Sequence, residues 1–224
     1  MLNLIHNERE GERIDGSLLK NVLLFFLEIG MDDGMDLYKN DFEAHMFEDT
    51  LNYYSRKAAL WITVDSFTDY MRMVEDCLKR EEDSVAHYLH YSSKERLLEI
   101  VRNELLSHYP TRLVENEHSG LPTLLRDDKK HDLSRMYRLF CKISNGLDTI
   151  SNSFIQQLAT AGRTIVKQAE EDAAGGMQQH AFVRKVIELH DRYMEYVADI
   201  FQTNNVINNA LKQAFETICG NAIG

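Results

Sequence analysis

The sequence predicts an all-α protein, and three observations support that prediction. The 224 residues include only 2 prolines and 11 glycines, so few positions interrupt regular structure. Apolar residues recur at every third or fourth position over most of the chain, which is the period of a helix with one buried face. With 44% hydrophobic residues at this length, the chain can bury a core without disulfides or a metal ion.

In the first half of the chain, the apolar period predicts four helices joined by short loops. The expected segments are Leu18–Ile29, Leu37–Val64, a helix that starts at Ser66–Asp69 and continues to Leu89, and a helix from Ser92 to His108 that Pro110 stops. Ser92 and Glu95 have the spacing of a capping box. A broken apolar stripe makes the second segment a long amphipathic helix, and its members are Tyr38, Phe42, Met46, Tyr53, Leu60, Trp61 and Val64. Its aromatic members, Tyr38, Phe42, Tyr53 and Trp61, are expected to be core.

The second half begins with a looser stretch, Thr111–Arg126, and then becomes helical again. The expected helices are Leu133–Cys141, Leu147–Glu171, Phe182–Phe201 and a last short one, Val206–Cys219, with breaks at Asn145–Gly146 and Gly175–Gly176. The whole chain should thus contain about seven or eight helices. Apolar positions match at an offset of about 114 residues, which predicts two stacked helical repeats. Leu19 with Leu133 and Phe26 with Phe140 are two such matches.

Charge and composition disfavour several classes of partner and several cellular locations. The formal net charge of -11 disfavours nucleic acid and anionic lipid, since such a surface repels phosphates. The longest apolar run, Val22–Leu27, is too short to span a bilayer. Met1–Glu10 contains acids and no sustained apolar stretch, so we expect neither a secretory signal nor a transit peptide. Three cysteines far apart in the sequence favour free thiols in the cytoplasm or nucleus.

The motifs that could carry chemistry are weak. Glu115–His118 contains one Glu-x-x-His, where a di-iron bundle needs two, and His87 with His90 lacks a third ligand at suitable spacing. Asp32–Asp36 places its glycine third, unlike a calcium loop, and is expected to be a turn. The charge runs Lys79–Asp83 and Arg126–Lys130 are expected to be solvated faces. We therefore predict no catalytic, cofactor-binding or metal-binding residue and no cofactor.

Several segments, in order along the chain, resemble the cullin family, and most closely the plant cullins that work with F-box proteins. The segments are Ile14–Gly30 (IDGSLLKNVLLFFLEIG), Tyr53–Ile62 (YYSRKAALWI), Cys77–His90 (CLKREEDSVAHYLH), Glu117–Gly120 (EHSG), Leu124–Phe140 (LLRDDKKHDLSRMYRLF) and Val183–Val197 (VRKVIELHDRYMEYV). The match in order and spacing extends over essentially the whole chain.

The resemblance implies a stalk built from five-helix cullin repeats, of which residues 1–115 would be the second and residues 116–224 the third. It also implies a non-catalytic scaffold of a cullin-RING ubiquitin ligase of the SCF type, a rigid spacer between substrate receptor and RING subunit in ubiquitin-dependent degradation. The implied partners are the F-box adaptor and the RING subunit, although no residue of this chain matches their docking regions. Alternatives are a truncated cullin-like paralogue acting as a decoy or a helical tether, and a helical-bundle enzyme.

A stalk cut at both ends should expose apolar side chains on its first and last helices. We expect this exposure to allow self-association, and the residues concerned are Leu2, Leu4, Ile5, Val206, Leu211, Phe215 and Ile218.

Overall fold

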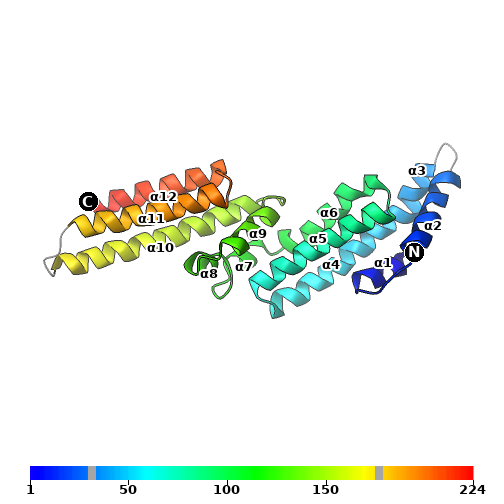
Figure 1. Cartoon of the computed structure of the whole chain (residues 1–224), viewed down its shortest axis with the longest axis horizontal. Helices are drawn as coiled ribbons and strands as arrows, with labels where there is room; N and C mark the ends of the chain where they lie inside the picture. The colour runs from blue at the N-terminus through cyan, green and yellow to red at the C-terminus, as the bar shows by residue number, and fades with distance from the viewer. Residues whose placement is uncertain (30–33, 175–178, 224) are drawn as a thin grey trace. The chain divides into compact units, whose positions relative to one another are not determined.

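The computed structural model describes residues 1–29, 34–174 and 179–223, and all regular secondary structure within these ranges is helical. The chain forms two compact units (Figure 1). Unit 1 consists of residues 1–65 and 69–108, and unit 2 consists of residues 66–68 and 109–224. The prediction of an all-α fold is confirmed.

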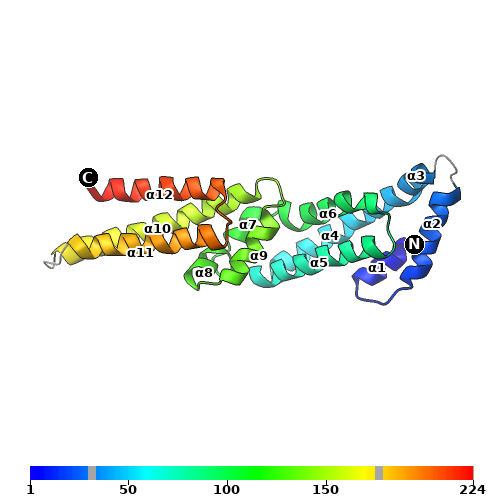
Figure 2. The same cartoon turned by 45° about the horizontal axis from the view of Figure 1, so that its top comes forward.

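Unit 1 is built around two helices of 21 residues each, α4 (Ala44–Val64) and α5 (Phe67–His87). These run beside α6 in both views of the fold (Figures 1 and 2). The remaining elements are α1 (Leu2–Arg9), α2 (Gly16–Ile29), α3 (Gly34–Leu37), the π-helix η2 (Tyr38–Glu43), the short 3-10 helix η3 (Tyr91–Ser93), α6 (Lys94–Arg102) and the π-helix η4 (Asn103–Ser107). The helix expected over Leu37–Val64 is thus one helical path that contains a π-helical section.

The core of unit 1 confirms part of the predicted stripe. Tyr38, Phe42, Met46 and Tyr53 are buried, whereas Trp61 is half-buried. Leu60 and Val64 belong to the same apolar stripe but are exposed, with exposed fractions of 57% and 73%. The buried face of α4 rotates around the helix toward Tyr54 and Ala58, because a straight helix drifts from strict heptad spacing. The last turn of α4 therefore presents aliphatic side chains to solvent.

Unit 2 is organised around α10 (Gly146–Ala174), which has 29 residues and packs against each of the other helices of the unit. These are α7 (Pro110–Val114), α8 (Leu121–Arg126), α9 (Lys130–Phe140), α11 (Gln179–Asp199) and α12 (Asn205–Ile223). In its core, the Phe154 ring on α10 lies 4.9 Å from the ring of Tyr193 and 5.4 Å from that of Phe201. Tyr137 on α9 packs edge-on against the same Phe201 at 5.6 Å. An aromatic cluster therefore joins α9, α10 and α11.

Three expected boundaries differ from the structure. The stretch 111–126 contains α7 and α8, because Pro110 starts a helix at a position where its missing N–H costs nothing. The Ser92 capping box is not formed: Ser93 precedes α6, and the His90 side chain accepts the hydrogen bond of the Ser92 N–H. The last helix is longer than expected and reaches Ile223. With these added elements the described residues contain more helices than expected.

The predicted break at Asn145–Gly146 is confirmed, and its geometry requires both residues. Asn145 adopts a left-handed conformation with φ 59°, which asparagine tolerates better than most residues. A Cβ atom on Gly146 would lie 2.1 Å from the Phe140 carbonyl oxygen, so only glycine fits there. The break at Gly175–Gly176 lies outside the described residues.

The aromatic core of unit 2 gives a direct test of packing. Phe140 is fully buried, so Phe140→Ala should lower the free energy of unfolding by roughly 3 kcal/mol or more, as removal of a buried aromatic ring does. Phe25→Ala changes a ring that is 59% exposed and serves as the matched control, with an expected loss under about 1 kcal/mol. Urea denaturation followed by circular dichroism measures both values. Equal losses in the two variants would contradict this assignment of the core.

Candidate functional site

The structure does not bring the candidate metal ligands together. The His87 Nδ1–H donates to the Asp83 carbonyl oxygen at 2.6 Å, whereas His90 Nδ1 lies 2.7 Å from the Ser92 hydroxyl. Within the described ranges, no three His, Cys, Asp or Glu side chains are grouped so that they could hold a metal ion. Asp32 and Asp33 lie outside the described residues. The absence of a catalytic, cofactor or metal site stays a prediction.

The loop around Glu115–His118 has a packing role that the sequence analysis did not assign. Asn116 Oδ1 accepts hydrogen bonds from the backbone N–H groups of His118 and Ser119, both at 3.0 Å. The Ser119 hydroxyl in turn accepts the N–H of Phe67, the first residue of α5, at 2.9 Å. A Cβ atom on Gly120 would lie 2.5 Å from the Val114 carbonyl oxygen, so the loop requires glycine there. The EHSG segment therefore caps a helix.

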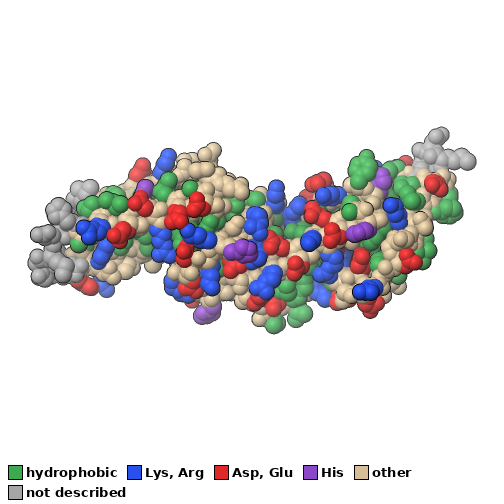
Figure 3. Space-filling model, viewed as in Figure 1, with side chains coloured by type: hydrophobic (Ala, Val, Ile, Leu, Met, Phe, Trp, Pro, Cys, Tyr) green, Lys and Arg blue, Asp and Glu red, His purple; other side chains and the backbone are tan. Residues whose placement is uncertain are grey.

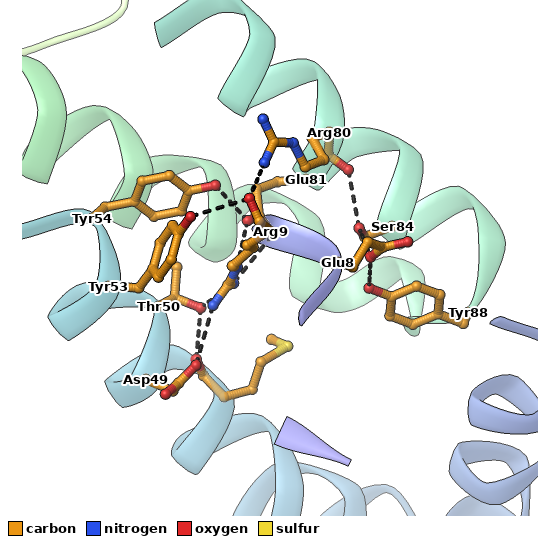
Figure 4. A network of polar contacts seen from close by, with 11 residues as sticks. Glu8, Arg9, Asp49, Thr50, Tyr53, Tyr54, Arg80, Glu81, Ser84 and Tyr88 are labelled. Atoms are coloured by element: carbon orange, nitrogen blue, oxygen red, sulfur yellow. Dashed lines mark hydrogen bonds and ion pairs between the residues drawn. The ribbon is translucent and has the colours of Figure 1, made fainter. Parts of the chain in front are cut away.

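A buried charged network lies where α1 meets α4 and α5 (Figure 4). The Arg9 Nε–H donates to Glu81 Oε1 at 2.8 Å, and each of these two side chains is only 2% exposed. The Arg9 Nη2 group also donates to Thr50 Oγ1 at 2.7 Å, and Nη1 lies 3.3 Å from Asp49 Oδ2. One guanidinium therefore binds side chains of both long helices of unit 1.

Two tyrosines of α4 complete the surroundings of this ion pair. The Tyr54 hydroxyl donates to Glu81 Oε1 at 2.6 Å, and the Tyr53 hydroxyl donates to the Arg9 carbonyl oxygen at 3.2 Å. The Arg9 guanidinium carbon also lies 5.5 and 5.6 Å from the centres of the two rings, within the range of a cation–π contact. Arg80 donates a further hydrogen bond to the Arg9 carbonyl oxygen. The network thus binds both the side chain and the backbone of Arg9.

The residues on either side of Arg9 bind separate partners. Glu8 Oε2 lies 3.0 Å from the Ser84 hydroxyl and 2.5 Å from the Tyr88 hydroxyl, both from α5 or the residue after it. Glu10 pairs with Lys57 of α4 at 3.0 Å in a more exposed position. Three consecutive residues at the end of α1 therefore bond to α4, to α5 or to the residue that follows α5. These bonds fix the rotation of α1 about its axis and its position along that axis.

Burial and nearby charges change the ionisation of these groups. Burial raises the pKa of Tyr54 well above its usual range, and the negative charge of Glu81 raises it further. Burial raises the pKa of Cys77 to about 11. For Arg9, burial lowers the pKa, but the Glu81 carboxylate outweighs that effect, and the net pKa is raised. The Lys57 hydrogen bond lowers the pKa of Glu10. The Arg9 guanidinium therefore stays charged in the buried pair, and the Tyr54 phenol stays neutral.

This arrangement stabilises a helix contact. Its polar atoms bond one another, and the charged groups at its centre are closed to solvent, whereas a catalytic group has to reach a substrate. The best candidate functional site in unit 1 is therefore a structural clamp on α1. We call Arg9, Thr50, Tyr54 and Glu81 the α1 clamp.

Comparison with known proteins identifies the family. A family model described as "Cullin alpha solenoid domain" matches residues 1–223. The chain belongs to the cullin family. It is 52% identical to Cullin-1 of Oryza sativa subsp. japonica and 42% identical to Cullin-2 of Arabidopsis thaliana, and each comparison covers 100% of this chain. It is also 33% identical to Cullin-3 of Dictyostelium discoideum over 96% of its length.

The chain spans about a third of the length of these cullins, since the rice and Arabidopsis matches each cover 31% of the relative. The predicted family and the solenoid fold class are both confirmed. The assignment of residues 1–115 and 116–224 to the second and third cullin repeats stays a prediction. No described helix is long and apolar enough to cross a membrane.

The α1 clamp is not predicted from the sequence. The charge run Lys79–Asp83 is expected to be a solvated face, which is wrong for Glu81, whose exposed fraction is 1%. A signal was present in the spacing, because Glu81 follows Cys77 by four residues and precedes Val85 by four, inside the apolar stripe of α5. Arg9 likewise follows the buried Ile5 by four residues. A charged residue inside an apolar stripe should be read as a candidate member of a buried pair.

The expected exposure of the end helices is also wrong for most of the residues named. Ile5, Leu211, Phe215 and Ile218 are buried, and Leu2 and Leu4 are half-buried, because the helices of each unit cover them. Val206 alone of that set is exposed, at 43%. Most of the apolar side chains that were expected to allow self-association are therefore covered within their own unit.

Removal of one partner of the α1 clamp should lower the stability of the fold. Arg9→Met leaves the Glu81 carboxylate buried without its cation, and we expect the free energy of unfolding to fall by roughly 3 kcal/mol or more. The double variant Arg9→Met with Glu81→Leu should lose less than the sum of the two single losses, measured by urea denaturation. Glu10→Ala breaks the exposed Lys57 pair and is the control, with a loss under about 1 kcal/mol. Additive losses in the double variant would show that Arg9 and Glu81 do not interact.

The raised pKa of Tyr54 predicts a loss of stability in alkali. Its pKa is higher in the folded chain than the value of about 10 in an unfolded chain, so the stabilisation is complete below about pH 10 and is lost as the pH rises further. The slope should reach roughly 1.4 kcal/mol per pH unit for this group. Urea midpoints between about pH 9 and pH 11.5 should fall less steeply for Tyr54→Phe than for the wild type. Tyr91→Phe, at a ring 78% exposed, should keep the wild-type slope, and a wild-type slope in Tyr54→Phe would refute the prediction.

Proposed function

We propose that this chain is a non-catalytic scaffold segment of a cullin-RING ubiquitin ligase of the SCF type, where it acts as a rigid spacer between substrate receptor and RING subunit. The observation that carries the proposal is the match of the cullin alpha solenoid family model to residues 1–223. The family resemblance in the sequence supplies the rest: an F-box adaptor and a RING subunit as partners in the assembled ligase, and ubiquitin-dependent degradation in the cytoplasm and nucleus as the process.

The internal structure of each unit supports a spacer role. A spacer has to resist bending, and resistance in a helical protein comes from close-packed contacts along the whole length of each helix. In unit 1, two helices of 21 residues, each about 31 Å long, contribute to one core and to the α1 clamp. In unit 2, the 29-residue α10 contacts every other helix of its unit. Buried side chains of these long helices therefore build the core of each unit.

Affinity capture of the native protein from the cells that express it tests the proposal. We expect the captured complex to contain the RING subunit and the F-box adaptor, identified by mass spectrometry, with the chain detected on a blot as part of a species larger than 26.0 kDa. Capture from cells that lack this chain is the control for non-specific binding. A species near 26.0 kDa without either subunit would overturn the proposal and favour a cullin-like decoy or tether.

A further inference from the structure

A groove runs between α10 and α12 on the surface of unit 2. Its volume is about 320 Å³. Its floor and walls are mainly apolar, and the side chains that form them are Ile155, Ala159 and Val166 of α10 with Ala214 and Ile218 of α12. The residues of α10 along the groove, from Ile155 to Val166, cover about 16 Å, which is about three helical turns.

Small residues shape this groove. A Cβ atom on Gly162 would lie 2.6 Å from Ile218 Cδ1, so the Ile218 side chain of α12 packs directly on α10 at this glycine. Ala159 and Ala214 also line the groove and leave it unfilled because their side chains are short. The groove-lining positions 155, 159, 162 and 166 of α10 alternate by four and three residues along one helix face. Ile218 of α12 already packs on this face at Gly162, so a further helix would lie along α10 beside α12. The shape therefore suits a helix better than an extended strand.

The charged side chains that line the groove are positive, whereas the net charge of the chain is negative. Arg163 and Lys167, one turn apart on α10, are the charged residues among those that line it, in a chain with a net charge of -11. Both are exposed, and within the described ranges neither pairs with a carboxylate; Arg163 donates to the Thr160 hydroxyl at 3.2 Å. Another cation of the same unit, Lys130, pairs with Glu195, and on the face seen in Figure 3 the two signs are interspersed.

We propose that this groove docks an amphipathic α-helix of a partner protein, with aliphatic side chains facing the groove and acidic side chains facing Arg163 and Lys167. Helix-in-groove recognition uses apolar anchors at helical spacing for affinity and flanking charges for orientation and choice of partner. Arg163 follows Gly162 and Lys167 follows Val166, so both cations flank the apolar seam on the same side. Acidic residues at a spacing of four on the partner would meet both cations.

The proposal goes beyond the scaffold function and does not depend on it. Binding of basic helices is opposed by the same two cations, so the surface selects for charge as well as for helical shape. Among the described side chains, neither Arg163 nor Lys167 forms an ion pair, so both cations are available to acidic groups of a partner.

The test uses the full chain and a synthetic fluorescent peptide of about fifteen residues, with leucines at heptad spacing and glutamates on both flanks. We expect fluorescence anisotropy to show binding of this peptide and no binding of the version with lysine in place of each glutamate. Arg163→Glu with Lys167→Glu should weaken binding tenfold or more. Lys129→Glu with Lys142→Glu changes the net charge equally at exposed positions of unit 2 and should change the affinity less than twofold.

A groove-filling variant tests the apolar part of the site. Ala159→Phe should abolish binding of the acidic peptide while the helix content measured by circular dichroism stays at the wild-type level. The proposal is overturned by equal binding of the acidic and basic peptides, by wild-type affinity in the Arg163 and Lys167 double variant, or by no binding at about millimolar concentration. Displacement of the peptide by the fatty acid laurate alone, without an effect of the charge reversal, would assign the groove to a small amphiphile instead.

Discussion

The organisation of unit 1 depends on one buried ion pair, between Arg9 of α1 and Glu81 of α5. Placing two charges where each side chain is 2% exposed is unfavourable unless geometry and further hydrogen bonds compensate for the lost water. Here the compensation comes from Thr50, which accepts a hydrogen bond from Arg9 Nη2, and from Tyr54, which donates one to Glu81 Oε1. Asp49 adds a second anion 3.3 Å from Arg9 Nη1. Any sliding or rotation of α1 would break these bonds together, so the pair selects one position of three helices.

The apolar contacts of α1 agree with that position. Ile5 lies one turn before Arg9 and is buried in the same cluster as Leu19, Phe42 and Val85. The helix thus places one apolar and one charged side chain on the same face, and each finds its partners in the same register. Apolar packing alone tolerates a shift of register more readily than a bonded charge does, so the pair adds specificity to a contact that the core already favours.

Much of this fold followed from the sequence, and the errors have common physical causes. Helical periodicity correctly located the long helices and the break at Asn145, because each depends on residues close in sequence. Periodicity reports which face of a helix is buried and says nothing about a polar residue on that face, so Glu81 was misread. The burial of Leu211 and the exposure of Val64 depend on where other helices end in space, which spacing within one helix does not contain.

The two groups of charges in this cullin-family chain contribute in opposite ways. In the α1 clamp, a cation and an anion cancel each other inside the protein, and the result is rigidity without a surface that a partner could recognise. Along the α10–α12 groove, the chain leaves two cations exposed beside apolar residues that no large side chain covers. At this groove, the absence of a side chain on Gly162 lets Ile218 of α12 pack directly on α10, while Ala159 and Ala214 leave space beside that contact. Small residues on the surface of a helical unit leave room for a partner, while the large side chains of its core stay closely packed. A docking site of this kind therefore does not require a more flexible core.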